Sequence, residues 1–310
     1  MSQGEHHSGR ASPQNLTVNR RAFTHASLQL DAPAKLNLSL AVVGQRADGF
    51  HELAGVTVLI ELADRLRLLP GCAGLRLEGA TGGVPAAPAA NLAWRGLVAG
   101  LGGEPEDGCL TLEKRIPVAA GLGGGSSDAA AAWRLGRRWR SVDAAETPEA
   151  TELGSLTGIG ADVPFFAAAV PAAYVTGVGE RIEPLAPDAE PPHVVLAHPP
   201  FGLETAAVFA ELRREECSVD APPRTLEAGR NDLFAAARRL RPELDELWAL
   251  VVAAGGDPHM TGSGPTLFTM THDPERASSV AARLERGDVR VTRTRLREAA
   301  ASIVPIAEEE

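Results

Sequence analysis

A run of glycines between a predicted strand and a predicted helix restricts the fold of this chain more than any other feature. The run reads GLGGG and contains Gly121, Leu122, Gly123, Gly124 and Gly125. Residues 109–112 before it have the pattern of a strand, and residues 128–140 after it have the pattern of a helix. Glycine lets the backbone approach an anion closely, and the start of a helix offers unpaired N–H groups. The sequence therefore predicts a phosphate-binding loop.

A flexible connector is the alternative explanation of a bare glycine run. Two hydroxyl residues, Ser126 and Ser127, lie where the helix begins, and Pro117 stiffens the segment before the glycines. Hydroxyl side chains are frequent at helix starts, where backbone N–H groups bind anions. These flanking residues favour phosphate binding over a connector.

The scarcity of lysine decides which kind of phosphate loop this is. Lys35 and Lys114 are the two lysines among 30 basic residues, and neither follows a glycine. A Walker A motif needs Gly-Lys-Ser/Thr, so the P-loop NTPases are excluded. A dinucleotide-binding fingerprint that starts at Gly121 would need glycine where Ser126 stands. The sequence motifs of protein kinases, serine hydrolases and zinc proteases are also absent.

The order of the predicted elements indicates an α+β protein, because strands gather before helices. The strands, predicted as an antiparallel run in the first part of the chain, are residues 28–43, 56–61, 64–69, 75–78, 109–112, 172–176, 193–197 and 289–296, with a hairpin turn at 44–49. The helices are one capped by Asn91 and those at residues 128–140, 147–156, 205–215, 232–240 and 242–254.

A chain of 310 residues is long enough for two domains. The proline-rich residues 183–192 form the predicted linker. We therefore expect a disordered leader at residues 1–27, an N-terminal domain at 28–184 with the phosphate loop, and a C-terminal domain at 185–310.

Composition excludes several classes of protein. With 30 basic and 40 acidic residues the net charge is −10, so the broad positive field that attracts nucleic acid is missing. No stretch approaches the roughly 20 apolar residues of a membrane-spanning helix. Cys72, Cys109 and Cys217 are far apart and suggest neither a disulfide framework nor a zinc site. A cytoplasmic location fits these observations.

Three motifs, in order, resemble those of the GHMP kinases (galactose, homoserine, mevalonate and phosphomevalonate kinases). Residues 117–131 (PVAAGLGGGSSDAAA) resemble the second motif, which wraps the ATP phosphates, and residues 32–38 (APAKLNL) and 261–268 (TGSGPTLF) resemble the first and third. Residues 44–53 (GQRADGFHEL) and 160–166 (GADVPFF) narrow the resemblance to the 4-diphosphocytidyl-2-C-methyl-D-erythritol kinase family. It covers about residues 32–296.

The resemblance implies a two-domain fold and a reaction. The N-terminal domain should resemble ribosomal protein S5 domain 2, and the C-terminal domain should be ferredoxin-like. The implied enzyme uses ATP, with Mg²⁺ bound to it, to phosphorylate the 2-hydroxyl of 4-(cytidine 5′-diphospho)-2-C-methyl-D-erythritol in non-mevalonate isoprenoid synthesis. The sequence offers no metal cage of its own, and a monomer or homodimer is expected. The alternatives are a GHMP kinase for another small alcohol and a catalytically silent ligand-binding protein on this scaffold.

By this resemblance, Asp162 is the catalytic base and Lys35 stabilises the developing negative charge. A nearby ammonium group is physically sensible beside a catalytic carboxylate. Without the resemblance, Asp162 would be a cap or turn residue before Pro164, and Lys35 would face solvent from an alternating strand.

The remaining site residues are also implied by resemblance. The ATP-binding residues are Asn91, Lys114, Pro117, Gly121, Leu122, Gly123, Gly124, Gly125, Ser126, Ser127, Gly262, Ser263 and Gly264; a helix cap and a surface charge are the alternatives for Asn91 and Lys114. The substrate-binding residues are Asn37, Phe50, His51, Thr205 and Phe209. Phe50 would stack on cytosine where many relatives have tyrosine, which keeps the ring but loses any hydroxyl contact. An aromatic side chain of the core is the alternative for Phe50.

Overall fold

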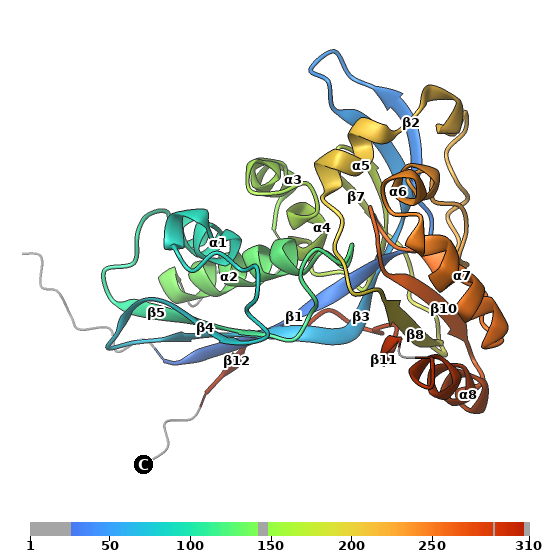
Figure 1. Cartoon of the computed structure of the whole chain (residues 1–310). Helices are drawn as coiled ribbons and strands as arrows, with labels where there is room; N and C mark the ends of the chain where they lie inside the picture. The colour runs from blue at the N-terminus through green and yellow to red at the C-terminus, as the bar shows by residue number, and fades with distance from the viewer. Residues whose placement is uncertain (1–25, 142–147, 288, 307–310) are drawn as a thin grey trace, which may run out of the picture.

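The computed structural model describes residues 26–141, 148–287 and 289–306. Two β-sheets, each covered by helices, lie side by side (Figure 1). The predicted leader, residues 1–27, lies outside the described residues except for its last two positions.

The first sheet has eight strands within the described residues, and β3 is its longest member. Strands β12, β1, β3, β5 and β4 are hydrogen-bonded in that order, β2 and β6 pair with the first half of β3, and β7 pairs with β6. The strands are β1 (Leu28–Asn37), β2 (Ala41–Gln45), β3 (His51–Leu69), β4 (Ala73–Gly79), β5 (Gly108–Lys114), β6 (Ala172–Gly177), β7 (Arg181–Pro184) and β12 (Val304–Pro305).

Helices α1 (Leu92–Leu101) and α2 (Gly124–Arg140) pack on one face of this sheet (Figure 1). The two helices touch at backbone distance, since a Cβ atom at Gly96 would lie 2.1 Å from the carbonyl oxygen of Ala129. Leu30, Leu66 and Leu110 of the sheet form the core beneath them. Two short helices, α3 (Ala150–Ser155) and α4 (Val163–Ala167), follow before β6.

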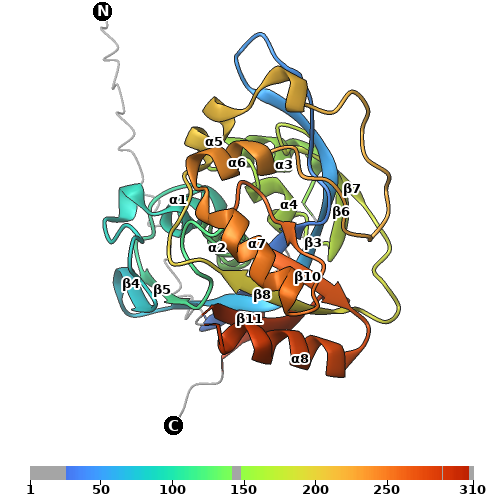
Figure 2. The ribbon, with the colours of Figure 1, turned by 45° about the vertical axis from the view of Figure 1, so that its right-hand side comes forward.

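The second sheet is antiparallel, with strand order β11-β8-β10-β9. Its strands are β8 (His193–His198), β9 (His259–Met260), β10 (Leu267–Thr271) and β11 (Arg290–Arg295). The helices of this part are α5 (Thr205–Glu211), α6 (Phe234–Leu240), α7 (Glu243–Ala253) and α8 (Pro274–Glu285). Figure 2 shows α7 and α8 in front of and below this sheet. Short 3-10 turns lie at Pro88–Ala90, Leu156–Gly158 and Arg214–Glu216.

The two sheets share a hydrophobic core. Leu36 and Ile60 of the first sheet belong to the same buried cluster as Leu196 and Phe268 of the second. Burying one continuous apolar surface fixes the sheets against each other.

The predicted α+β class is confirmed, while several details differ. The strand expected over residues 28–43 is two strands, β1 and β2, and those expected at 56–61 and 64–69 are one strand, β3. Strand β4 pairs parallel to β5, so the first sheet is not antiparallel throughout. Helix α2 begins at Gly124, four residues earlier than predicted, because the last glycines continue into its first turn. Position 147 lies outside the described residues, and the domain boundary at 184/185 stays a prediction.

The expectation that the cysteines form no disulfide is wrong. Cys72 and Cys109 are bonded, with 2.07 Å between their sulfur atoms. They are 37 residues apart in the sequence, but the parallel pairing that sets Ala73 opposite Gly108 brings their Cα atoms to 5.2 Å. That distance suits a disulfide, and sequence spacing alone cannot reveal a pairing of distant strands.

None of the helices in the described ranges is long and apolar enough to cross a membrane.

Candidate active site

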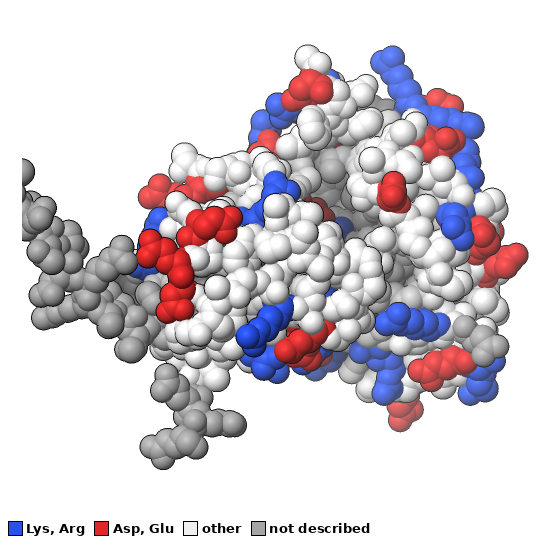
Figure 3. Space-filling view, turned by 60° about the vertical axis from the view of Figure 1, so that its left-hand side comes forward, with Lys and Arg blue, Asp and Glu red and all other residues white. Residues whose placement is uncertain are grey.

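A cavity of about 680 Å³ lies between the phosphate loop, the end of β1, helix α5 and the glycine-rich turn that follows β9. The space-filling view in Figure 3 shows a hollow whose surroundings are mostly uncharged. Lys35 and Lys114 are the cationic side chains among its described lining residues, and Asp128 and Asp162 are the acidic ones. The cavity is therefore large enough for a nucleotide, but it contains few charged side chains that could bind phosphate.

Backbone amides supply what the side chains lack. Helix α2 has 17 residues and starts from Gly123 in the left-handed conformation (φ 71°), and this glycine at the N-cap position has no side chain to cap the first turn. The first N–H groups of such a helix have no partner within it and lie at the positive end of its dipole. The residues from Gly121 to Ser126 line the cavity. The loop thus presents the anion-binding arrangement that the sequence predicts.

Glycine is required at position 123 because of what packs there. A Cβ atom on Gly123 would lie 2.9 Å from the ring of Phe166 and 3.0 Å from Cγ of Lys35. The left-handed backbone also disfavours any larger residue. The loop is therefore fitted directly against the lysine side chain and the segment after Asp162.

Lys35, Asn37 and Asp162 meet at the bottom of the cavity. The Lys35 ammonium group donates a hydrogen bond to Oδ1 of Asn37 and lies 3.8 Å from Oδ2 of Asp162. Lys35 is 3% exposed, whereas the Asp162 side chain is 46% exposed. The alternative of a solvent-facing Lys35 is therefore wrong. Asp162 does occupy the position before α4, but its side chain caps nothing, so its carboxylate is available to a ligand.

Asn37 is bonded on several sides. Its amide nitrogen Nδ2 donates to Oγ1 of Thr57 over 3.0 Å, and its backbone N–H donates to Oγ1 of Thr261 over 3.0 Å. A bulge in the pairing of β1 with β3 lies between Pro33 and Lys35. Bulges change the direction in which side chains point, and this one lies just before the lysine.

Lys114 is buried in an ion cluster. Its ammonium group donates to the carboxylates of Asp64 and of Asp128, and all three residues are at most 4% exposed. Burial alone would lower the pKa of Lys114, but Asp128 and Asp64 outweigh it and raise that pKa. Burial raises the pKa of Asp128 well above its ordinary range. The alternative of a surface charge at Lys114 is wrong, and its ammonium is already neutralised at this side of the cavity.

Asn91, another predicted ATP-binding residue, caps α1. Its Oδ1 accepts hydrogen bonds from the N–H groups of Ala93 and Trp94 over 2.9 and 3.3 Å, and Asn91 also lines the cavity. Asn91 is therefore a helix cap, as the alternative reading of the sequence held, and its contact with the nucleotide stays a prediction.

Two of the predicted substrate residues line another part of the cavity, and His51, which does not line it, contacts one of them. Thr205 and Phe209 of α5 line it, and Oγ1 of Thr205 lies 3.0 Å from Oγ of Ser263. The His51 ring stacks on Phe209 with 5.2 Å between centroids. Phe50 is 64% exposed, which does not fit the core alternative, and is not among the lining residues. The structure thus brings three of these side chains together and leaves Phe50 on the hairpin outside.

Two predicted ATP-binding residues do not line the cavity. Ser127 is 1% exposed and its hydroxyl donates to the carbonyl oxygen of Pro33 over 2.7 Å, so it ties α2 to β1. Gly264 lies in the third glycine-rich turn behind Gly262 and Ser263, which do line the cavity. Pro117 and the phosphate-loop residues from 121 to 126 line it as predicted.

The sequence interpretation missed several supporting residues. Asp64 and Asp128 hold Lys114, and Asn231 binds the third turn through its amide. Asp64 and Asp128 are 50 and 14 residues from Lys114, and Asn231 is about 30 residues from the turn that it binds. No local sequence pattern therefore marks these residues. Two acidic residues among apolar neighbours indicate a buried ion cluster only once the positions of the strands are known.

Comparison with known proteins agrees with this architecture. Residues 91–169 match the protein family described as "GHMP kinases N terminal domain", and residues 223–289 match the family described as "GHMP kinases C terminal". A homoserine kinase structure from Cytophaga hutchinsonii superimposes with a TM-score of 0.60 at 14% identity, covering 89% of this chain and 98% of the other. At that identity the likeness shows the fold alone, which is that of the GHMP kinases.

Closer relatives narrow the class. A crystal structure of 4-(cytidine 5′-diphospho)-2C-methyl-D-erythritol kinase superimposes with a TM-score of 0.70 at 34% identity, covering 86% of this chain and 98% of the other. The 4-diphosphocytidyl-2-C-methyl-D-erythritol kinases of Paramagnetospirillum magneticum and Pelotomaculum thermopropionicum are 38% and 39% identical, with 83% and 85% of this chain and 94% and 96% of theirs covered. The chain belongs to this kinase family.

Proposed function

We propose that the protein transfers the γ-phosphate of ATP to the 2-hydroxyl of 4-(cytidine 5′-diphospho)-2-C-methyl-D-erythritol, giving the 2-phosphate and ADP. The observation that carries the proposal is the buried Lys35 ammonium 3.8 Å from the half-exposed Asp162 carboxylate, beside an uncapped helix start in one cavity. Relatives named for this reaction, 34–39% identical over most of the chain, support it.

Phosphoryl transfer needs positioning and electrostatic stabilisation more than covalent chemistry from the protein. Asp162 accepts the proton of the acceptor hydroxyl, since its carboxylate faces the cavity and caps no helix. Lys35 stabilises the negative charge that develops on the attacking oxygen and the transferred group. Asn37 holds the lysine ammonium in place and keeps one amide hydrogen for the alcohol, because its other bonds go to Lys35 and Thr57.

ATP is the proposed phosphoryl donor, and its phosphates bind to the backbone amides at the start of α2. The donor set suits magnesium carried by the nucleotide, because among the described residues no group of three or more His, Cys, Asp or Glu side chains could hold a metal. Magnesium keeps most of its ligands as water and phosphate oxygen in such sites. The Ser126 hydroxyl, which lines the cavity at the loop, would supply one contact. Bound magnesium neutralises phosphate charge.

The cytidine end of the acceptor is assigned to Thr205, Phe209 and His51. The stacked His51 and Phe209 rings and the cavity-lining Thr205 hydroxyl offer an apolar face and hydrogen-bonding groups for a base. Phe50 would cover the base from the outside if the hairpin between β2 and β3 closes over it. The cytoplasmic location, the lack of nucleic-acid and membrane partners, and the monomeric or homodimeric state remain predictions.

A coupled assay of ADP release over a panel of alcohols tests the function. The cytidine diphosphate substrate should be the fastest acceptor; faster turnover of mevalonate or homoserine would favour another GHMP kinase activity, and no turnover with any alcohol would favour the silent ligand-binding protein. Asp162→Asn should abolish ADP release while ATP still binds. The matched control Asp188→Asn, at a partly exposed carboxylate that accepts the N–H of Glu190 and does not line the cavity, should keep wild-type turnover. Near-normal turnover of the Asp162 variant would remove it from the role of base.

A further inference from the structure

The third glycine-rich turn, residues 261–264, packs on the phosphate loop and on the lysine. A Cβ atom on Gly262 would lie 2.9 Å from Nζ of Lys35 and 2.8 Å from the carbonyl oxygen of Gly121. The turn also accepts the backbone N–H of Asn37 through Thr261. Because a side chain at position 262 would have no room beside the Lys35 ammonium, a shift of the turn toward the lysine changes the space in which that ammonium sits.

One side chain holds this turn from behind. Nδ2 of Asn231 donates to the carbonyl oxygens of Met260 and Gly262, over 2.8 Å each, and Oδ1 accepts the N–H of Leu233 over 3.0 Å. These bonds use both amide hydrogens and the amide oxygen. A side-chain amide is the group that offers two donors and an acceptor in this arrangement.

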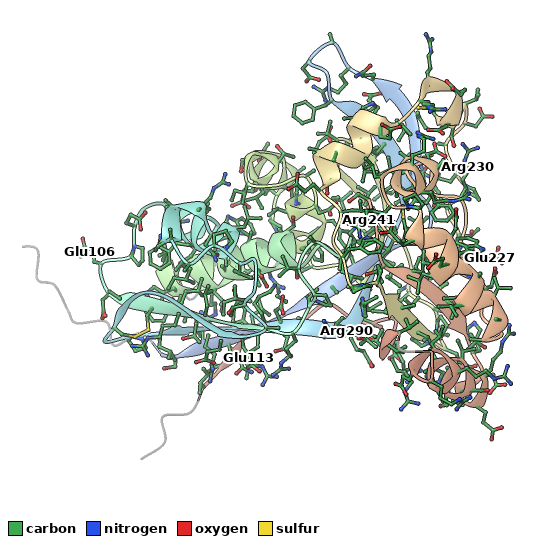
Figure 4. The ribbon with its side chains drawn as sticks, in the orientation of Figure 1. Glu106, Glu113, Glu227, Arg230, Arg241 and Arg290 are labelled. Atoms are coloured by element: carbon green, nitrogen blue, oxygen red, sulfur yellow. A yellow bond between two sulfur atoms is a disulfide. The ribbon has the colours of Figure 1, made fainter. Side chains whose placement is uncertain are left out.

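Asn231 is itself fixed to the strand that carries Lys35. The N–H of Leu40 donates to the carbonyl oxygen of Arg230 over 2.9 Å, and the N–H of Asp232 donates to that of Leu40 over 2.9 Å. The N–H of Gly229 bonds to Leu38 over 2.7 Å. Leu38 and Leu40 follow β1 directly. Figure 4, in which Arg230 is labelled, shows this segment beside α6.

We infer that Asn231 is a positioning residue for phosphoryl transfer: its amide clamps the third turn to the end of β1 and thereby holds the Lys35 ammonium toward Asn37 and Asp162. Asn231 does not line the cavity, so it acts through the turn and not on the ligands. The inference rests on the proposed function, because it assumes that Lys35 and Asp162 perform the transfer.

The test compares Asn231→Asp and Asn231→Ala with the wild-type chain in the ADP-release assay. The aspartate has the same shape and still accepts from Leu233, but it has no donors and sets a carboxylate against two carbonyl oxygens. The alanine removes the clamp without adding charge, and it replaces the aspartate if that variant does not fold. For both, kcat per nucleotide-binding site should fall at least tenfold, while the KM for ATP changes less than threefold.

Asp232→Asn is the matched control. Asp232 is buried in the same segment and accepts the N–H groups of Val42 and Ser218 over 2.9 and 2.7 Å, away from the third turn. This variant should lower thermal stability but keep kcat within twofold. Wild-type kcat in a folded Asn231 variant would overturn the inference, and so would an equal loss of kcat in Asp232→Asn. Failure of the proposed function shows differently, as no ADP release from the wild-type chain with the cytidine diphosphate substrate.

Discussion

A buried histidine behind the third glycine-rich turn should make the protein sensitive to mild acid. His198, at the end of β8, is 5% exposed, and its ring nitrogens lie 3.2 Å from Oγ1 of Thr266 and 3.1 Å from Oγ1 of Thr292. Burial, with a smaller contribution from Arg290, lowers the pKa of His198 from 6.5 to about 4. Arg290 starts β11 (Figure 4) and pairs with His198 across the sheet.

The direction and size of the effect follow from this difference. In the unfolded chain the imidazole binds a proton below pH 6.5, whereas in the folded protein it stays neutral down to about pH 4. The stabilisation is therefore complete above pH 6.5 and is lost as the pH falls toward 4. At about 1.4 kcal/mol per pH unit, the loss of unfolding free energy is about 2 kcal/mol by pH 5 and about 3.5 kcal/mol in total.

Urea unfolding at pH 7, 6 and 5 measures this loss. The variant His198→Gln keeps one donor and one acceptor for the two threonine hydroxyls but cannot be protonated. Between pH 7 and 5 the free energy of unfolding of the wild-type chain should fall about 2 kcal/mol more than that of the variant, since the other histidines are common to both. Parallel pH dependences of the two proteins would refute the reasoning.

Three further outcomes are expected. Lys114→Met leaves two buried carboxylates without their cation and should cost about 3–5 kcal/mol of unfolding free energy at pH 7 in urea titration; a loss below about 1 kcal/mol would mean that the cluster adds no net stability. Gly121→Ala puts a methyl group 2.5 Å from the carbonyl oxygen of Thr261 and should weaken ATP binding at least tenfold by calorimetry, whereas Gly103→Ala, where a Cβ meets nothing, should not. Cys72→Ser opens a loop of 37 residues and should lower stability by about 2–4 kcal/mol, with the KM for ATP unchanged; an altered KM would contradict a purely structural bond.

Local signals were sufficient for the parts of the fold that depend on neighbouring residues. The cap at Asn91, the glycine loop and the helix after it all read directly from short patterns, because capping and left-handed turns involve residues within a few positions. The α+β class followed from the order of such patterns. The length of β3 did not, because a change of partner from β6 to β5 within one strand leaves no mark in the sequence.

Side chains with distant partners escaped prediction. Asn37 donates its backbone N–H to Thr261, which lies 224 positions later in the sequence. The side-chain amide of Asn231 has a role only because a turn about 30 residues later folds onto it. The burial of Lys114 likewise depends on Asp64, 50 residues before it. Motif resemblance supplied Lys35 and Asp162, but neither periodicity nor composition supplies the residues that hold them.

Strand β3 joins a wall of the cavity to the ion cluster around Lys114 through one continuous piece of backbone. Its first half, starting at His51, pairs with β2 and β6 on the side of the proposed acceptor site. Its second half reaches Asp64 and then pairs with β5 on the side of Lys114. The strand thus fixes the distance between the proposed acceptor site and the ion cluster. An engineer who wants a different acceptor can exchange the β2–β3 hairpin as a cassette and leave the nucleotide half intact. A deletion of one residue between Thr57 and Asp64 would instead move every side chain of the second half of β3 to the other face of the sheet. Both the contact of Asp64 with Lys114 and the present pairing with β5 would then be lost.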